Sequence, residues 1–295
     1  MNTPTWRSAL LALLTLLPTA VTAAESADTP AHPAAALAFR AIGPAYPSGR
    51  IADFAIHPQS RAHWYVATAS GGLWETRNAG TTWSPLFDEQ ASYAIGAIAM
   101  DPQDPLTLWV GTGENNAQRS VAAGDGVYLS RDGGRSWVHA GLADSGHISQ
   151  IHVDGEDSDT VLVAAQGPLW SDGGDRGLYR TRDGGASWEP LLQIDEHTGV
   201  NEFAVHAENP DLIVASSYQR RRHVWTLING GPGSGIHRSR DGGETWERVT
   251  AGLPQDVMGR IGLAAAPSAP NRLYAIIEAQ DGEEGVYLSE DFGQN

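Results

Sequence analysis

An eight-residue pattern recurs along this chain and limits its fold more than any other feature. Each copy runs Ser/Thr-Arg-Asp/Asn-Gly/Ala-Gly-x-Ser/Thr-Trp, and the tryptophans of the complete copies are 54, 51 and 58 residues apart. The complete copies span residues 76–83, 130–137, 181–188 and 239–246, and a fifth copy begins at residue 289. A repeat of about 50 residues indicates structural units of one kind that pack side by side.

Each repeat also contains four short apolar stretches separated by turn residues. In the second repeat the first three stretches are residues 95–100, 108–111 and 126–129, and the tryptophan of the pattern begins the fourth. Four short strands joined by turns are typical of a propeller blade. We therefore expect an all-β propeller of four-stranded antiparallel blades, with about five blades present and the ring incomplete.

Turn formation explains the repeated pattern, which we call the box. Its Asp or Asn can accept hydrogen bonds from nearby backbone amides, its glycines permit positive φ, and its Trp can pack between sheets. We expect these tryptophans to be mostly buried. A calcium loop needs several converging carboxylates, so one acid per box predicts no metal site. The structural box positions are Asn78, Trp83, Asp132, Trp137, Asp183, Trp188, Asp241, Trp246 and Asp291.

The N-terminal residues differ from the repeats. A basic residue precedes an apolar run at residues 9–17, which ends before small residues suited to cleavage. The run is too short to cross a bilayer, so residues 1–24 are predicted to be a secretory signal peptide. We expect residues 25–36 to be a disordered leader and residues 37–295 to be a propeller domain. The mature chain would be periplasmic or secreted, with no membrane span.

Charge and composition exclude several functions. The formal net charge is −16, and all 19 basic residues are arginines. A field of this sign repels phosphates, so no nucleic-acid partner is predicted. The absence of cysteine excludes disulfides, thiolate metal sites and a cysteine nucleophile. No cofactor is predicted.

The box resembles the Asp-box (BNR) repeat of sialidases, xyloglucan-cleaving endoglucanases, sortilin-type receptors and a photosystem II assembly factor. Residues 111–114, 124–128 and 230–235 are similar to stretches of large exported bacterial proteins described as sortilin-like or glycosyl-hydrolase-like. Those proteins continue beyond five blades. The resemblance therefore implies that this chain is an N-terminal fragment.

The resemblance also implies that ligands bind on the face opposite the boxes, which the connections between second and third strands would line. These connections are long at residues 113–125, 166–176 and 217–234. Long loops on a rigid scaffold are common binding sites. Arginine holds carboxylates by two contacts, and aromatic rings stack on sugars or cations, so a peptide or carbohydrate ligand is predicted. The alternative to ligand binding is that the three consecutive arginines at residues 220–222 are simply solvated and balance the charge of nearby acids. The candidate ligand-binding residues are Arg50, Glu114, Arg119, His147, Trp170, Tyr218, Arg220, Arg221, Arg222, Trp225 and Arg260.

Polar residues interrupt the first strand of several repeats. The third position is Asp53, Gln150 and Glu202 in repeats one, three and four, while Arg50 and Arg260 precede the strand in repeats one and five. A buried carboxylate is costly unless it is paired. Two interpretations stay open: salt bridges that join the blades, or a charged pocket where the two arginines and two acids converge. In the second, Asp53 and Glu202 are the candidate catalytic residues.

Two functions follow from these observations. A binding module that grips a peptide or glycan, as sortilin-type receptors do, needs only shape, arginines and aromatic residues. A sialidase- or xyloglucanase-like glycoside hydrolase usually needs two carboxylates beside the scissile bond. In xyloglucan-cleaving relatives the first blade carries an acid where this chain has Ala69, and no sialidase-type Tyr-Glu pair can be assigned. We favour the binding module and keep the hydrolase as the alternative.

The fifth repeat is expected to lack a fourth strand of its own, which leaves an unpaired sheet edge. Residues 38–43 resemble the fourth strands and could pair at such an edge.

Overall fold

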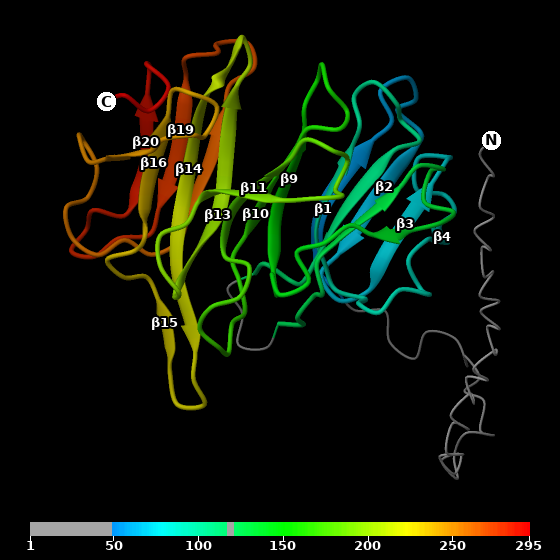
Figure 1. The fold of residues 1–295 in the computed structure, drawn as a ribbon, viewed down its shortest axis with the longest axis horizontal. Helices are drawn as coiled ribbons and strands as arrows, with labels where there is room; N and C mark the ends of the chain where they lie inside the picture. The colour runs from blue at the N-terminus through cyan, green and yellow to red at the C-terminus, as the bar shows by residue number, and fades with distance from the viewer. Residues whose placement is uncertain (1–48, 117–120) are drawn as a thin grey trace, which may run out of the picture. The chain divides into compact units, whose positions relative to one another are not determined.

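The computed structural model describes residues 49–116 and 121–295 (Figure 1). The predicted signal peptide, the predicted leader and residues 37–48 lie outside this part. Strands, turns and bends make up the described residues, which contain no helix. None of them therefore forms a helix that could span a membrane.

The strands form five antiparallel sheets, one for each repeat, which we call blades one to five. Blade one contains β1 (Ile51–Ile56), β2 (Trp64–Thr68), β3 (Gly72–Thr76) and β4 (Ser84–Pro85). Blade two contains β5 (Ile95–Met100), β6 (Leu108–Thr112), β7 (Val127–Ser130) and β8 (Val138–His139). Blade three contains β9 (Ile148–Val153), β10 (Val161–Ala165), β11 (Gly177–Thr181) and β12 (Glu189–Leu192).

Blades four and five depart from this plan. Blade four contains β13 (Thr198–His206), β14 (Asn209–Arg222), β16 (Gly235–Ser239) and β17 (Glu247–Val249), and β15 (Leu227–Asn229) pairs with the end of β14. Blade five contains three strands in the described part of the chain: β18 (Ile261–Ala265), β19 (Leu273–Ile277) and β20 (Gly285–Ser289). The expected all-β fold of four-stranded blades is confirmed, with the last blade incomplete as predicted.

Successive blades pack face to face. The inner strands β1, β5, β9, β13 and β18 contact one another in chain order, and each neighbouring pair of blades shares one apolar core. Close approach is required between blades two and three, because a Cβ on Gly111 would lie 2.3 Å from the Ile148 side chain. The alternating apolar residues of each repeat therefore form the surfaces between blades.

The box turns have the expected structural role. In blade two, Asp132 accepts hydrogen bonds from the amides of Arg135 and Ser136, both at 2.9 Å, and from the Ser136 hydroxyl at 2.7 Å. The hydroxyl bond from Ser136, then its amide bond, lowers the pKa of Asp132 to about 2. Asn78 accepts the equivalent amide bond from Thr82 at 2.8 Å in blade one.

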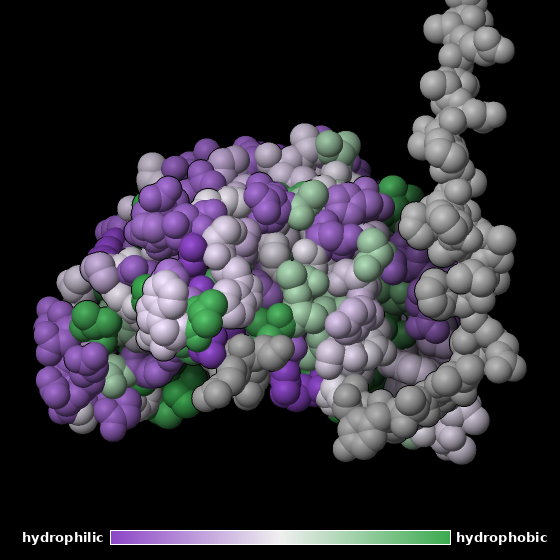
Figure 2. Space-filling view, turned by 90° about the horizontal axis from the view of Figure 1, so that it is seen from below, coloured by the Kyte–Doolittle hydropathy of each residue, from purple (hydrophilic) through white to green (hydrophobic). Residues whose placement is uncertain are grey.

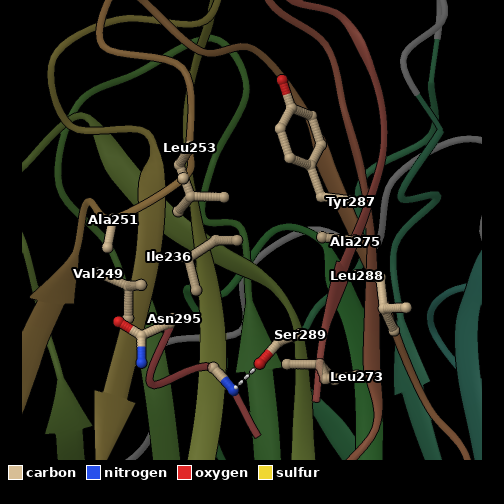
Figure 3. A pocket seen from close by; sticks show the side chains of 12 residues that line it. Ile236, Val249, Ala251, Leu253, Leu273, Ala275, Tyr287, Leu288, Ser289 and Asn295 are labelled. Carbon is tan, nitrogen blue, oxygen red and sulfur yellow. Dashed lines mark hydrogen bonds between the residues drawn. The ribbon is translucent and has the colours of Figure 1, made fainter. Parts of the chain in front are cut away.

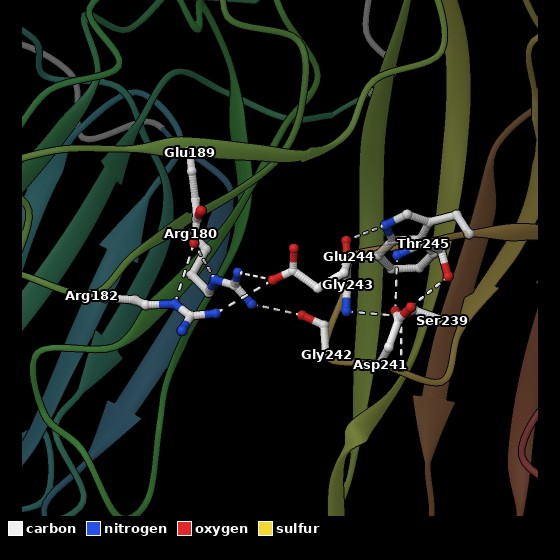
Figure 4. A network of polar contacts seen from close by, with 10 residues as sticks. Arg180, Arg182, Glu189, Ser239, Asp241, Gly242, Gly243, Glu244 and Thr245 are labelled. Atoms are coloured by element: carbon white, nitrogen blue, oxygen red, sulfur yellow. Dashed lines mark hydrogen bonds and ion pairs between the residues drawn. The ribbon is translucent and has the colours of Figure 1, made fainter.

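A buried arginine ties the box turn of blade four to blade three (Figure 4). Arg180 on β11 donates to the Gly242 carbonyl at 2.8 Å and to the Glu244 carboxylate at 2.6 Å. Its third contact is Glu189 on β12 of its own sheet, so one guanidinium joins two blades.

The prediction that the box tryptophans are mostly buried is confirmed for Trp137, Trp188 and Trp246, which pack against the cores between blades, whereas Trp83 is 40% exposed. The indoles of blades two and three lie over the end of the preceding blade, where Trp137 donates to the Leu86 carbonyl at 2.9 Å. Trp83 has no preceding blade within the described residues, and it packs against Trp64 with ring centroids 6.3 Å apart.

The connection at residues 217–234 is not an irregular loop. Strand β14 continues to Arg222 and pairs with β15, with Arg220 opposite Asn229 and Arg222 opposite Leu227. This two-stranded extension, which we call the ribbon, protrudes beyond blade four at the bottom of Figure 1.

Candidate functional site

The ribbon lies on the face opposite the box turns. In an antiparallel blade the connection before the third strand and the box after it are at opposite ends of that strand. The described parts of connections 113–125 and 166–176, together with the ribbon, therefore share one side, which we call the loop face. Direct bonds join them: Arg222 N donates to the Leu169 carbonyl at 2.8 Å.

Arg220 is at the centre of these connections. Its side chain is buried, donates to Gln166 Oε1 at 3.1 Å and donates to the Asn116 carbonyl at 2.7 Å. One guanidinium thus joins the ribbon of blade four to the connections of blades two and three. Because its donors point inward, Arg220 supports the loop face from beneath.

Arg50 and Glu114 form an ion pair between blades one and two. Glu114 is buried and also accepts a 3.3 Å bond from Asn116, while the Arg50 side chain is 48% exposed. Candidate residue Arg119 lies in the same connection, outside the described residues. The ion pair places Arg50 against blade two.

His147 is buried beside two arginines. Burial, followed by the nearby guanidiniums of Arg220 and Arg176, lowers the pKa of His147 to about 3. Its imidazole is therefore neutral at physiological pH, and its Nδ1 lacks a hydrogen-bond partner within the described part of the chain. Its position makes it part of the interior beneath the loop face.

Two further candidates fix the ribbon. Tyr218 is buried, and its hydroxyl donates to Asn229 across the ribbon. Arg221 forms an ion pair with Asp172 of the blade-three connection, and His197 lies 2.9 Å from the same carboxylate. These contacts hold the ribbon in one orientation relative to blade three.

The tip of the ribbon, by contrast, is uncovered. Val224 is 87% exposed and Trp225 is 82% exposed, and the Trp225 ring stacks on His223 with centroids 5.3 Å apart. Trp170 is 55% exposed and follows Leu169, the residue bonded to the base of the ribbon. We call residues 223–225 the aromatic tip. Figure 2 views the molecule from the side on which the ribbon protrudes, with apolar patches set among hydrophilic ones.

The polar residues at the third position of the inner strands, Asp53, Gln150 and Glu202, connect neighbouring blades. Asp53 accepts a 3.0 Å bond from the amide of Ile98, and Glu202 accepts a 2.7 Å bond from the amide of Leu263. Gln150 accepts the equivalent bond from Phe203 N at 2.8 Å. Each side chain therefore bonds the backbone of the next inner strand. Burial raises the pKa of Asp53 and Glu202, and these backbone bonds oppose the rise.

The four charged residues expected to converge are divided between two places. Glu202 and Arg260 line one pocket of blade five together with Glu278 and Glu284. Arg50 and Asp53 instead contact blade two through Glu114 and the Ile98 amide. Within the described residues, no group of three or more His, Asp or Glu side chains could hold a metal ion.

Comparisons with known proteins agree with this architecture. The BNR/Asp-box repeat model matches residues 237–248. An ancestral GH74 enzyme has a solved structure that superposes with a TM-score of 0.63 at 19% identity, over 81% of this chain and 30% of that chain. The fold is a BNR-type β-propeller.

The sequence relatives of this propeller include glycan-acting enzymes. A xyloglucanase of Paenibacillus sp is 24% identical over 208 residues, which cover 64% of this chain and 19% of that protein. A xyloglucanase of Acetivibrio thermocellus is 26% identical over 234 residues, which cover 66% of this chain and 24% of that protein. The chain spans about a fifth to a quarter of the length of these relatives. The propeller therefore resembles part of a glycosyl-hydrolase-like protein.

Sequence reasoning missed the neutral residues that link the propeller's inner strands. Gln166 donates to Asn201 at 2.7 Å, and Asn201 donates to the Ile261 carbonyl of blade five at 2.8 Å. With Arg220 bonded to Gln166, these residues form a polar chain from blade two to blade five. Its signal in the sequence is the second inner-strand position, where Asn201 replaces the smaller residues of the other repeats.

Proposed function

We propose that this chain supplies a binding module, exported by the predicted signal peptide, that grips a peptide or glycan on the loop face. The observation that carries the proposal is the aromatic tip. Val224 and Trp225 are 87% and 82% exposed at the end of an ordered ribbon. Exposed apolar groups of this size are costly in water and commonly mark a surface that a partner covers.

The support beneath the tip favours binding. Arg220, the Arg221–Asp172 pair and the Tyr218–Asn229 bond hold the ribbon in place before any ligand arrives. A surface that is ordered in advance loses less conformational entropy when it binds. The buried candidate residues thus act indirectly, by holding the exposed ones.

The chemistry of the surface fits both ligand classes. Indole rings stack on sugar faces and also contact apolar side chains of peptides. Xyloglucan is the substrate in the names of the sequence relatives, which supports a glycan.

The test is binding on a glycan array and on a peptide array, with wild-type and variant proteins compared in parallel. Trp225→Ala is expected to remove the wild-type signal, because it removes the largest exposed ring of the tip. Val138→Ala is the matched control, since Val138 is 68% exposed on β8, away from the loop face. Equal signals from the wild type and Trp225→Ala would contradict the proposal.

A second candidate function is glycoside hydrolysis at the blade-five pocket. Glu202 lines this pocket with Glu278 and Glu284, and burial raises the pKa of Glu202, as a general acid requires. If this pocket hydrolyses xyloglucan, new reducing ends should form when the polysaccharide is incubated with the wild type. They should not form with Glu202→Gln. Turnover that persists in Glu202→Gln would rule out this pocket.

A further inference from the structure

One buried arginine shapes the connection at residues 166–176. The Arg176 side chain, of a residue only 3% exposed, donates to four backbone carbonyls: Gln166 at 2.8 Å, Pro168, Ser171 at 2.7 Å and Gly173 at 2.8 Å. A guanidinium has five N–H donors, so these bonds use most of them. Arg176 therefore fixes the course of the backbone from within and is not itself open to a ligand.

Trp170 lies within this fixed segment and stays open to solvent. The carbonyls of Pro168 and Ser171, on either side of it, are both bonded to Arg176, yet 55% of Trp170 is exposed. The segment also packs closely on the guanidinium, because a Cβ on Gly167 would lie 2.1 Å from Arg176 Cγ. The indole is thus held on a backbone that loses little conformational entropy when a partner covers the ring.

Exposed acids lie around the same segment. Four belong to it or to the adjoining connections between blades: Asp144, Asp172, Asp195 and Glu196. The side chain of Asp172 is 46% exposed and that of Glu196 is 70% exposed. Gly173 N donates to the Glu196 carbonyl at 2.8 Å, which holds the segment against the connection that carries Glu196. We call Trp170 and these four acids the acidic corner.

The cations near the acidic corner are already engaged. Burial lowers the pKa of Arg176, and the charges of three acids of the corner oppose this fall: Asp172, Asp195 and Asp144. Arg221 pairs with Asp172 and its side chain is only 17% exposed, and His197 Nδ1 lies 2.9 Å from the same carboxylate. Arg222 projects from the opposite face of the ribbon, because neighbouring strand residues alternate. The exposed charge of the corner is therefore negative, whereas the run of arginines had suggested a site for carboxylates.

The acidic corner differs in chemistry from the apolar pocket between blades four and five (Figure 3). That pocket is lined by side chains such as Ile236, Val249 and Leu273, which belong to or pack against the core of the two blades. Among the described residues that line it, none is charged. An exposed aromatic ring beside free carboxylates is instead a feature of the corner.

We propose that the acidic corner binds a cationic side chain, arginine or lysine, of a peptide. The inference rests on the proposed binding role of the loop face and names the class of ligand. The cation lies over the Trp170 ring, whose face attracts it electrostatically, and the exposed Glu196 carboxylate accepts its N–H groups. A neutral glycan has no cation to place there, so the corner favours a basic peptide over a glycan.

The test uses the full chain and two tetramethylrhodamine-labelled peptides that differ in charge, Gly-Ser-Arg-Leu-Arg-Ser-Gly and Gly-Ser-Gln-Leu-Gln-Ser-Gly. Fluorescence anisotropy at low ionic strength should show that the arginine peptide binds at least about tenfold more tightly than the glutamine peptide. This difference should decrease as the salt concentration rises, because salt screens exposed charges.

Protein variants locate the binding. Trp170→Ala should weaken binding of the arginine peptide by about tenfold or more, whereas Trp170→Phe, which keeps a ring, should weaken it less. Glu196→Gln should weaken it by about threefold or more. Glu156→Gln, which removes an exposed acid on the box side, is the matched control and should bind as the wild type does.

Three outcomes would overturn the inference. The first is equal affinity of the wild type for the two peptides, and the second is an equal loss of binding in Glu156→Gln and Glu196→Gln, which would indicate attraction by net charge alone. The third is binding of a glycan that requires Trp225 and is unaffected by Glu196→Gln, which would leave the proposed function intact. The absence of any signal on the glycan and peptide arrays would contradict the proposed function, and this inference with it.

Discussion

Charged and neutral side chains perform the same task between the blades. Asp53, Gln150 and Glu202 each accept a backbone amide of the next inner strand, at 2.7 to 3.0 Å. Gln150 also donates to the Phe203 carbonyl at 3.0 Å, which a carboxylate cannot do. The bond to the next blade therefore needs an acceptor oxygen at this position and does not need a charge.

Replacing the charged Glu202 by a neutral side chain tests this conclusion. Glu202→Gln keeps an acceptor for Leu263 N and removes a buried charge, so its free energy of unfolding at neutral pH should equal or exceed that of the wild type. Glu202→Ala leaves the amide without its partner and should lose roughly 1–3 kcal/mol. Urea unfolding of both variants measures the difference, and a Gln variant as unstable as the Ala variant would show that the charge is essential.

The box aspartates predict how stability changes with acidity. The Ser187 hydroxyl, then its amide, lowers the pKa of Asp183 to about 2 from an ordinary value of 3.8. A group whose pKa is lowered on folding contributes stability above its unfolded pKa and loses it as the pH falls through the folded value. The free energy of unfolding should therefore fall as the pH drops from about 4 to about 2.

Blade one offers a matched replacement, because its box uses Asn78 in the same turn. Asp183→Asn keeps the acceptor oxygen and removes one titrating carboxylate. Its loss of stability over the same pH range, followed by circular dichroism, should be smaller than that of the wild type. An unchanged acid response would contradict this assignment.

At the scale of elements, the ribbon differs most from what the sequence allowed us to predict. The connection at residues 166–176 was expected with its observed bounds, because the apolar run of residues 161–165 ends before it and Leu178 and Tyr179 follow it. The three consecutive arginines at residues 220–222 did not indicate that strand β14 continues through them. Their roles depend on the pairing of β14 with β15, which leaves Arg220 buried beneath the loop face and turns Arg221 toward Asp172.

The Arg221–Asp172 pair is expected to order the ribbon more than it stabilises the fold. Asp172→Ala should leave the free energy of unfolding nearly unchanged, because ion pairs near the surface contribute little. Hydrogen exchange in residues 219–229 should accelerate, since the ribbon loses a contact with blade three. Glu156→Ala, at an exposed acid on the box side, is the control and should leave that exchange unchanged. Unaltered exchange in Asp172→Ala would show that the pair has no ordering role.

At the scale of the whole molecule, the repeats determine the arrangement of the blades, and the connections on the loop face differ from one blade to the next. Blade number, strand order and box turns follow from spacing and turn chemistry that are local in the sequence. The polar chain through Arg220, Gln166 and Asn201 runs from blade two to blade five, so its partners lie in different repeats and their pairing does not follow from any one repeat. The division of the candidate residues into buried supports and an exposed tip likewise cannot be derived from one repeat.

The outer surfaces of the end blades also differ from the surfaces between blades. Ile276 and Val286 of blade five are 62% and 71% exposed, and Ile51 and Ile56 of blade one are 59% and 58% exposed. In blade three, β10 and β11, which correspond to β19 and β20 of blade five, are buried throughout. Apolar alternation alone does not distinguish these surfaces, because every repeat carries it.

The location of a bound ligand tests the central proposal most directly. The measurement is hydrogen exchange of the full chain with and without the ligand that gives the strongest array signal. The account predicts that protection increases in residues 166–176 and 217–234 and stays unchanged in the box turns. Protection confined to the box turns, with the loop face unaltered, would contradict it.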